Sequence, residues 1–396
     1  MGKENFFKAY CFLWILCLMS GCNVRHRTST ENEAPVAANV RQTANSPASI
    51  PNEMDTTRYA LGYQVTPCDG YTKLEVHDPW NKGKLRQRYL LVARDKPLPD
   101  GMPAGTVVRV PLRKVVVYAA VYAAMLDKLG VANDILGVCE GQYIRTPAIA
   151  AGIEQGQIQD FGKVMSPDVE RMIASGVEVI IASPLENGSF GAISKTDIPI
   201  IECTDYMETD PLGRAEWIKI LGLLTGTTDR ADSLFQETEL NYHRLKTLAA
   251  NVTNRPKLMT ELKYGNTWYV SAGESFMAHI FKDAGADYIF SYLSGTGGIP
   301  LSFETVLNKA IHADIWLLSY NRDIAMTYQA LHADHSSYER FDPFRNRRIY
   351  GCNTHLSLYY EEVPFRPDYL LEELIAIFHP DLIFEHDFRY YHPLKE

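Results

Sequence analysis

Two glutamates stand at matching places in two similar passages of the sequence. Glu170 lies in "SPDVERMIASGVEVIIAS", residues 166–183, and Glu304 lies in "LSFETVLNKAIHADIWLLS", residues 301–319. Each passage predicts a short helix that begins after a Ser and leads into an apolar strand. The helix dipole favours a carboxylate in the first turn. The repeat indicates two related halves of the chain, and each Glu taken alone is an ordinary residue of a helix start.

Aromatic and polar side chains gather in the loops that follow the expected strands. Ligands of open parallel sheets bind beyond the carboxyl ends of the strands. Aromatic rings offer flat surfaces to a bulky ligand, and an arginine could meet a carboxylate, a phosphate or an anionic chelate. Trp268 and Glu186 are the first choices, although loop packing is an equal alternative for each residue taken alone. The predicted ligand-binding residues are Tyr118, Tyr143, Glu186, Asn187, Tyr206, Trp268, Tyr269, Tyr320 and Arg322.

The histidines give little support for a bare metal site. Sites for zinc or manganese combine several His with Asp or Glu, and the 11 His of the chain form no such sets on the expected loops. His332 and His335 form an "HADH" pair that fits one helical face, so a metal ion stays an alternative. Haem is a further alternative, because Tyr and His are usual axial ligands. We predict no protein-bound metal and no cofactor.

The sequence contains no strong motif for catalysis. It has neither a GxSxG nucleophile elbow nor a Walker lysine loop, and "SAGES" and "GTGG" are weak matches. We therefore expect a protein that is not an enzyme. Two alternatives of other classes stay open, namely a secreted α/β hydrolase that uses Ser271 or Ser275, and an envelope lipoprotein that organises a complex.

Composition and charge narrow the class of protein. The chain has 396 residues, which suggests two domains, and 46% hydrophobic with 22% charged residues is typical of a globular protein. The formal net charge is −9. Nucleic-acid binders carry a basic stripe instead, so we expect no nucleic-acid partner.

The first 22 residues are predicted to be a signal segment. The apolar stretch "AYCFLWILCLM" has 11 residues, which is too short to span a bilayer. "SGC" follows, and the segment resembles a bacterial lipoprotein signal in which Cys22 becomes the lipidated N-terminus. Residues 23–55 are rich in Asn, Thr, Ser, Ala and Pro, which is typical of a flexible tether.

The remaining pattern predicts two similar halves. Residues 56–112 have short alternating runs separated by turn signals, which indicates a small β-rich extension. Apolar strands alternate with helices in residues 113–227 and again in residues 255–396, and this predicts a parallel sheet in each half. Residues 228–254 carry a long helical stripe that suits a rigid connection. The expected fold is therefore α/β, with two Rossmann-like lobes joined by one long helix.

The order of several segments resembles a known family. These segments are "KVVVYAAVYAAMLDKLG", "SPDVERMIASGVEVIIA", "LGLLTGTTDRADSLFQE", "WYVSAGESFMAHIFKDAGADYIF" and "LSFETVL". Over residues 113–380 the chain resembles the substrate-binding lipoproteins of ABC importers, of the iron-siderophore and cobalamin type. Residues 56–112 lie outside the resemblance.

The resemblance implies two lobes with a ligand in the cleft between them. It also implies that Glu170 and Glu304 dock onto arginines of a membrane permease. We accordingly expect a monomeric, lipid-anchored protein that faces the periplasm and works with ABC permease and ATPase subunits. Its expected ligand is a metal chelate, either a cobalamin-type corrinoid or a ferric siderophore, with haem or a bare metal ion as alternatives.

Overall fold

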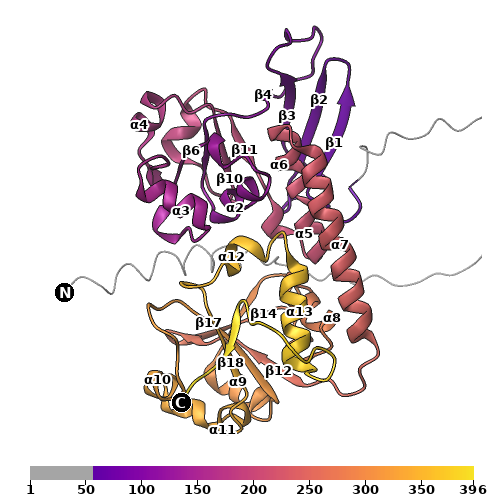
Figure 1. Cartoon of the computed structure of the whole chain (residues 1–396), viewed down its shortest axis with the longest axis vertical. Coiled ribbons are helices and arrows are strands. Elements are labelled where there is room, and N and C mark those ends of the chain that lie inside the picture. The colour runs from indigo at the N-terminus through magenta and orange to yellow at the C-terminus, as the bar shows by residue number, and fades with distance from the viewer. Residues whose placement is uncertain (1–56) are drawn as a thin grey trace, which may run out of the picture.

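A computed structural model describes residues 57–396 of the chain. Two α/β lobes lie one above the other, and helix α7 (Thr228–Ala250) runs along one side of both (Figure 1). The predictions for the signal segment, for Cys22 and for the tether concern residues outside the described range. Within residues 57–396, no helix has the length and apolar character needed to cross a bilayer.

The N-terminal lobe is built on a parallel five-stranded sheet. Its strand order is β11 (Ile200–Glu202), β10 (Val179–Ala182), β5 (Val115–Val117), β6 (Ile135–Val138) and β7 (Gln159–Asp160). The central strands are apolar on both faces because helices cover both faces of a parallel sheet. The helices of this lobe are α2 (Ala120–Lys128), α3 (Pro147–Glu154), α4 (Val169–Ala174), α5 (Pro211–Glu216) and α6 (Ile218–Thr225). A small hairpin is formed by β8 (Gly162–Lys163) and β9 (Ser166–Pro167).

The C-terminal lobe repeats this plan with one added antiparallel strand. Its sheet has the order β15 (Asp287–Tyr288), β12 (Lys257–Thr260), β17 (Ile315–Tyr320), β18 (Ile349–Asn353) and β19 (Tyr391–Pro393), of which only β19 is antiparallel to its neighbour. A three-stranded antiparallel sheet lies beside it, in the order β13 (Lys263–Tyr264), β14 (Thr267–Ser271) and β16 (Gly298–Leu301). The helices are α8 (Phe276–Asp283), α9 (Phe303–Ala310), α10 (Tyr328–Asp334), α11 (Asp342–Arg345), α12 (Tyr359–Glu362) and α13 (Pro367–Phe378).

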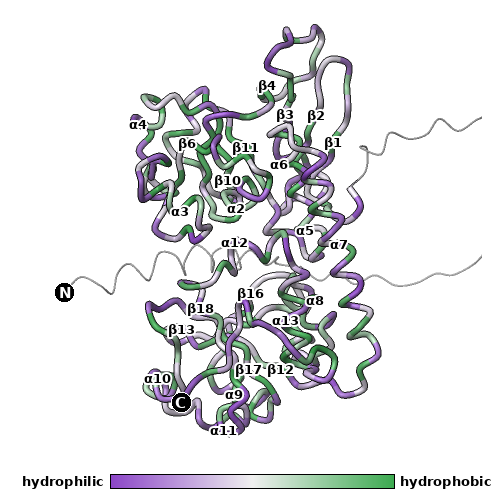
Figure 2. Tube along the Cα trace, in the orientation of Figure 1, coloured by the Kyte–Doolittle hydropathy of each residue, from purple (hydrophilic) through white to green (hydrophobic). Residues whose placement is uncertain are grey.

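Helix α7 belongs to the cores of both lobes. Ala231 and Phe235 in its first half are buried in the core of the N-lobe, while Tyr242, Leu245 and Ala249 are buried in the core of the C-lobe. Its 23 residues span about 34 Å at 1.5 Å per residue. Figure 2 shows hydrophobic residues on the central strands of both lobes and a mixture of hydrophilic and hydrophobic residues along α7. The amphipathic stripe thus makes α7 a connection that is packed at both ends.

The N-terminal extension forms a four-stranded sheet beside the N-lobe. It consists of β1 (Tyr63–Cys68), β2 (Tyr71–His77), β3 (Leu85–Ala93) and β4 (Thr106–Val110), with β4 parallel to β3. The Tyr89 hydroxyl donates to the carbonyl of Ile200 at 2.8 Å and accepts from the amide of Glu202 at 2.9 Å. The extension therefore covers the edge strand β11, whose backbone would otherwise be open to pairing. The α/β fold class with two lobes, one long helix and a β-rich extension is confirmed.

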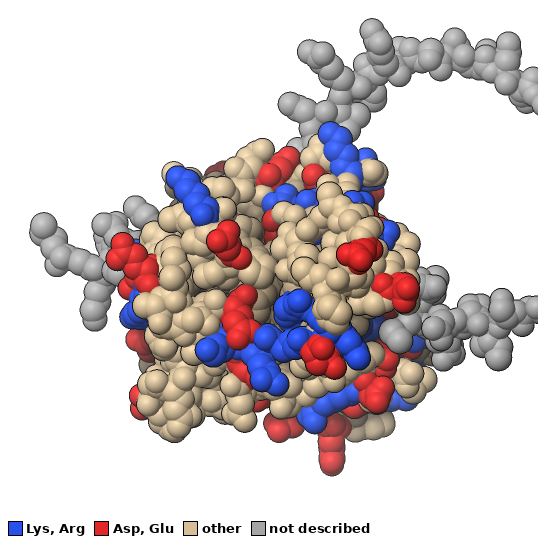
Figure 3. Space-filling model, turned by 90° about the horizontal axis from the view of Figure 1, so that it is seen from above, with Lys and Arg blue, Asp and Glu red and all other residues tan. Residues whose placement is uncertain are grey.

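Positively and negatively charged side chains lie on the outer face of the extension and the N-lobe. Seen from above, Lys and Arg lie interspersed with Asp and Glu on this face (Figure 3). Arg86 pairs with Glu202, and Arg94 pairs with Glu178. Both pairs link the extension to the N-lobe sheet and so help to fix its position.

Buried carboxylates hold the first described residues against α5. The Glu216 side chain, which is 1% exposed, accepts the backbone N–H groups of Tyr59 and Ala60, each at 2.9 Å. Glu208 accepts the N–H groups of Leu61 at 2.9 Å and Gly62 at 2.8 Å. These contacts satisfy a run of amides that lies outside regular secondary structure.

We predict that Glu216→Gln lowers the free energy of unfolding by about 3 kcal/mol, because an amide group then faces backbone donors in a buried position. Urea-induced unfolding measures the change. Glu154→Gln, at an exposed site at the end of α3, is the matched control and should change stability by less than about 0.5 kcal/mol. Equal stability of both variants would contradict the role of Glu216 in holding residues 59 and 60.

Candidate functional site

The loops at the carboxyl ends of the two five-stranded sheets meet between the lobes. We call these loops, together with α12, the interlobe face. Helix α12 of the C-lobe packs against α2 of the N-lobe. Arg145, which follows β6, donates from Nε to the carbonyl of His355, which follows β18, at 2.7 Å. Both sheets therefore direct their carboxyl ends to one region, which is where open α/β sheets bind ligands.

A buried polar network closes the N-lobe side of the interlobe face. The Tyr122 hydroxyl donates to Asp205 at 2.8 Å and lies 2.6 Å from the Ser183 hydroxyl, which therefore donates to it. Asp205 is 1% exposed and pairs with Arg214 at 3.4 Å. Burial raises the pKa of the Asp205 carboxyl, and Arg214 partly offsets this effect. The network is thus internally satisfied, and it rigidifies the point where the strand order of the sheet reverses.

Tyr118 differs from this network because its hydroxyl is unsatisfied. It directly follows β5, its side chain is 6% exposed, and no described residue hydrogen-bonds to its hydroxyl. Its ring meets Phe190 edge-on, with ring centroids 6.3 Å apart. Burial raises the pKa of this phenol well above its usual range. A buried hydroxyl without a partner is costly and marks a place where a ligand could supply one.

The other predicted residues of the N-lobe lie in two neighbouring loops. Glu186 and Asn187 are exposed in the loop after β10. The Tyr206 hydroxyl donates to the carbonyl of Pro184 in the same loop and so supports its shape. Tyr143 is half-buried at the end of the turn that follows β6. The structure thus brings Glu186, Asn187 and Tyr206 together.

Trp268 does not reach the interlobe face. Its side chain is 0% exposed, its indole N–H donates to the carbonyl of Thr260 at 3.0 Å, and its ring packs 5.7 Å from that of Trp316. Side chains alternate between the two faces of a strand, so Trp268 enters the C-lobe core while half-buried Tyr269 lies on the other face of β14. The expectation that Trp268 contacts a ligand is therefore corrected by the structure.

Tyr320 and Arg322 lie at the carboxyl end of β17, but both are engaged. The Tyr320 hydroxyl accepts from the amide of Met326 at 2.9 Å. Arg322 forms an ion pair with Asp334, and Asn353 donates to the carbonyl of Arg322 at 2.8 Å. The guanidinium of Arg322 would have to leave Asp334 before it could hold an anionic ligand.

Glu261 is a candidate for the site that the sequence reasoning missed. It directly follows β12, where the strand order of the C-lobe sheet reverses, and its φ of 66° is left-handed, which is rare for a residue other than Gly. Its carboxylate accepts from the Ser319 hydroxyl at 2.6 Å, and burial raises its pKa. Its position directly after the apolar strand "KLMT" is the signal that could have identified it.

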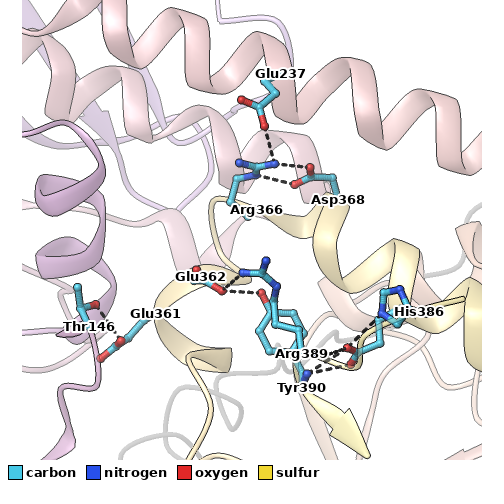
Figure 4. A network of polar contacts seen from close by, with 10 residues as sticks. Thr146, Glu237, Glu361, Glu362, Arg366, Asp368, His386, Arg389 and Tyr390 are labelled. Atoms are coloured by element: carbon cyan, nitrogen blue, oxygen red, sulfur yellow. Dashed lines mark hydrogen bonds and ion pairs between the residues drawn. The ribbon is translucent and has the colours of Figure 1, made fainter.

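Two adjacent glutamates of α12 tie the lobes together. Glu361, which is 3% exposed, accepts the Thr146 hydroxyl at 2.9 Å and the backbone N–H of Arg145 from the N-lobe. Glu362 accepts from Arg389 at 2.9 Å and from the Tyr390 hydroxyl at 3.1 Å (Figure 4). The short helix is therefore fixed to both lobes. The motif "YYEEVPF" carries no signal of this role in the sequence.

Further contacts join this region to α7 and α13. Arg366 pairs with Asp368 at 2.8 Å and with Glu237 of α7 at 3.0 Å (Figure 4). The guanidinium groups of Arg366 and Arg389 both lie over the ring of Tyr369, at 3.7 Å and 4.2 Å from its centroid. The interlobe contacts are therefore continuous with the connecting helix.

Glu170 and Glu304 occupy equivalent helix starts on opposite lobes. Glu170 is exposed in the first turn of α4, where Asp168 accepts the N–H of Arg171 at 3.0 Å. Glu304 is exposed in the first turn of α9, which Ser302 caps. Neither glutamate takes part in the interlobe face, and their docking role stays a prediction.

Comparison with known proteins identifies the part of the chain that carries the family pattern. A family model described as periplasmic binding protein matches residues 115–355, which is more than half of the chain. An uncharacterized lipoprotein of Methanocaldococcus jannaschii is 25% identical, and the match covers 93% of this chain and 91% of that protein. The extension lies outside the residues that the family model matches.

Solved structures share the fold. The periplasmic heme-binding protein HutB of Vibrio cholerae superposes with a TM-score of 0.52 and 18% identity, over 66% of this chain and 99% of that chain. An ABC-type Fe3+-hydroxamate transport system protein from Saccharomonospora viridis superposes with a TM-score of 0.53 and 15% identity, over 68% of this chain and 94% of that chain. At these identities the likeness establishes the fold alone.

We predict that Arg145→Ala loosens the junction between the lobes. The variant removes the guanidinium contacts to His355 but keeps the backbone N–H that Glu361 accepts. Charge-assisted hydrogen bonds of this kind stabilise the closed junction. Their loss should make amide exchange across residues 359–366 about tenfold faster or more. Hydrogen–deuterium exchange measures this, with exposed Arg348→Ala as the control. Unchanged protection of α12 would show that the contact does not hold the lobes.

Proposed function

Because the chain belongs to the periplasmic binding protein family, we propose that it is the solute-binding component of an ABC importer that captures a metal chelate between its lobes. The meeting of the two carboxyl-terminal sheet edges, fixed by the contact of Arg145 with His355, is the observation that carries this proposal. Such an arrangement lets two ligand-binding edges enclose one molecule. The protein itself performs no chemistry, and ATP hydrolysis belongs to the partner ATPase.

The proposed ligand contacts come from both lobes. Tyr118 carries the strongest support, because its buried hydroxyl has no described partner. The exposed or half-buried residues of the neighbouring loops complete the set, and the missed Glu261 joins it in place of Trp268. The proposed ligand-binding residues are Tyr118, Tyr143, Glu186, Asn187, Tyr206, Glu261, Tyr269, Tyr320 and Arg322.

A ferric siderophore or a cobalamin-type corrinoid is the proposed ligand class, with haem as the second candidate. The names of the V. cholerae and S. viridis proteins refer to heme and to Fe3+-hydroxamate, which supports an iron chelate. The corrinoid rests on the resemblance of the sequence segments alone.

A bare metal ion is less well supported than a chelate. No group of three or more His, Cys, Asp or Glu in residues 57–396 is placed to hold a metal. His335 packs against the rings of Phe303 and Tyr338, and His332 pairs with Glu339 at 3.3 Å. Both histidines of the "HADH" pair therefore contact other side chains of the C-lobe.

The partners and location follow from the same proposal. Glu170 and Glu304 would each meet an arginine of the permease, one on each lobe. Cys22 would carry the lipid anchor, and the monomeric protein would face the periplasm. The match to a lipoprotein of M. jannaschii supports the anchor.

We predict that purified protein is stabilised against heat by its ligand, and that Tyr118→Phe reduces the affinity about fivefold to tenfold without loss of stability. The substitution removes one hydroxyl that has no partner among residues 57–396, so a loss of affinity would report a contact with the ligand. Thermal shift screening with cyanocobalamin, haem, ferric siderophores and divalent metals identifies the ligand, and calorimetry gives the affinity. Exposed Tyr292→Phe is the control. Equal affinity of the variant and the wild type would remove Tyr118 from the site, and no stabilisation by any compound would refute the proposed function.

We predict that the double variant Glu170→Ala, Glu304→Ala binds its ligand normally but no longer supports uptake. Both side chains are exposed and distant from the interlobe face, so their loss should act on docking alone. Uptake in cells that depend on this receptor is the measurement. Glu154→Ala with Glu385→Ala, at two other exposed sites, is the control. Normal uptake in the docking variant would contradict the two-point dock.

A further inference from the structure

The fold holds Glu261 in a conformation that is unfavourable for its residue type. Its amide donates to the carbonyl of Leu317 at 2.8 Å, and its carbonyl accepts from the indole N–H of Trp316 at 2.8 Å. These two contacts fix the left-handed backbone at φ 66°. Strained backbone persists where the surroundings over-determine it, and such residues cluster at ligand sites. The strain places a carboxyl group at the switch point of the C-lobe sheet.

The carboxylate of Glu261 has spare acceptor capacity. A carboxylate can accept about four hydrogen bonds, and among the described residues Ser319 supplies it with two, from its hydroxyl and from its backbone N–H. No ion pair within residues 57–396 involves Glu261, and Lys263, two residues further on, does not pair with it. Burial of a charge without a cation is costly, so the site favours a ligand that brings a donor or a positive charge.

The arginines of the interlobe face, by contrast, each have an acceptor within the protein. Arg145 donates to the carbonyls of His355 at 2.7 Å and Gln142 at 2.8 Å. Arg214 pairs with Asp205, and Arg322 pairs with Asp334. An anionic ligand would therefore compete with the carboxylates and carbonyls that these guanidinium groups already contact.

The N-lobe side adds further negative charge. Glu186 is exposed in the loop after β10. Glu140 follows β6 in a left-handed conformation with φ 55°, and burial together with the charge of Asp160 raises its pKa, which Lys163 partly offsets. Carboxylates therefore lie at the interlobe face on both lobes.

We propose that the receptor selects a neutral or positively charged chelate over an anionic one, and that Glu261 with Ser319 receives a protonated amine or another hydrogen-bond donor of that ligand. The inference rests on the proposed interlobe site and defines its substrate class. Hydroxamate chelates that carry a free amine fit this description. Tris-catecholate complexes and haem, with their ionised oxygens, do not.

The test compares the binding of four iron compounds to the purified full-length protein by calorimetry. They are a linear trihydroxamate complex with a protonated amine, a neutral cyclic trihydroxamate complex, a tris-catecholate complex and haem. We expect the two hydroxamate complexes to bind at least about tenfold more tightly than the two anionic compounds. Glu261→Gln should weaken the amine-bearing complex about tenfold or more and the neutral complex less, as expected for loss of one charge-assisted hydrogen bond.

Glu385→Gln, at an exposed position without a described partner, is the control and should leave all four affinities unchanged. Tightest binding of an anionic compound, or an unchanged affinity of Glu261→Gln for the amine-bearing complex, would overturn the charge selection and leave the receptor function intact. Failure of all four compounds to bind the wild type would overturn the iron-chelate function and this inference with it. The preference of the wild type tests the inference even if the variant does not fold.

Discussion

The geometry of the whole molecule depends on the two adjacent glutamates of α12. Glu361 is bonded to the N-lobe and Glu362 to the C-terminal segment that follows α13. Helix α7 alone would set the distance between the lobes but would leave their relative rotation free about the ends of the helix. The junction at α12, together with the contacts of α5 with α8 and α13, removes that freedom, and the carboxyl ends of both sheets then meet in a defined way. The chemistry proposed for the interlobe face presupposes this alignment.

Buried glutamate side chains also attach the segments that lie outside the two lobes. Glu216 and Glu208 accept the amides of residues 59–62, and Glu373, which is 0% exposed, accepts the amides of Tyr390 and Tyr391. Each carboxylate is buried and would be costly without its donors. A backbone amide is a directional donor that is available only in one register. Buried carboxylates therefore specify where the extension and the C-terminal segment attach, in addition to stabilising the attachment.

Much of the fold could be predicted from the sequence because it follows from local patterns. Apolar strands, the helices between them and the long stripe of α7 are properties of short windows. The site was harder to predict, because the rule that loops after strands carry ligand contacts needs the strand ends to be known. Trp268 was assigned to a loop although it lies within β14, and Glu261 was overlooked although it follows β12 directly. The contact between Arg145 and Glu361 joins residues 216 positions apart, and no local window contains it.

Capture and release of a ligand must act against the junction at α12. The bonds of Glu361 and Arg145 lie on the interlobe face itself, so any separation of the lobes that admits a chelate must stretch or break them. Hydrogen bonds of this type contribute about 1–3 kcal/mol each, which is comparable to the free energy that ligand binding or docking can supply. A permease that grips Glu170 and Glu304, one on each lobe, would therefore need only a modest difference in affinity between the two arrangements to open the receptor. The interlobe contacts are strong enough to align the site and weak enough to be reversed, which is the balance that a delivery protein requires.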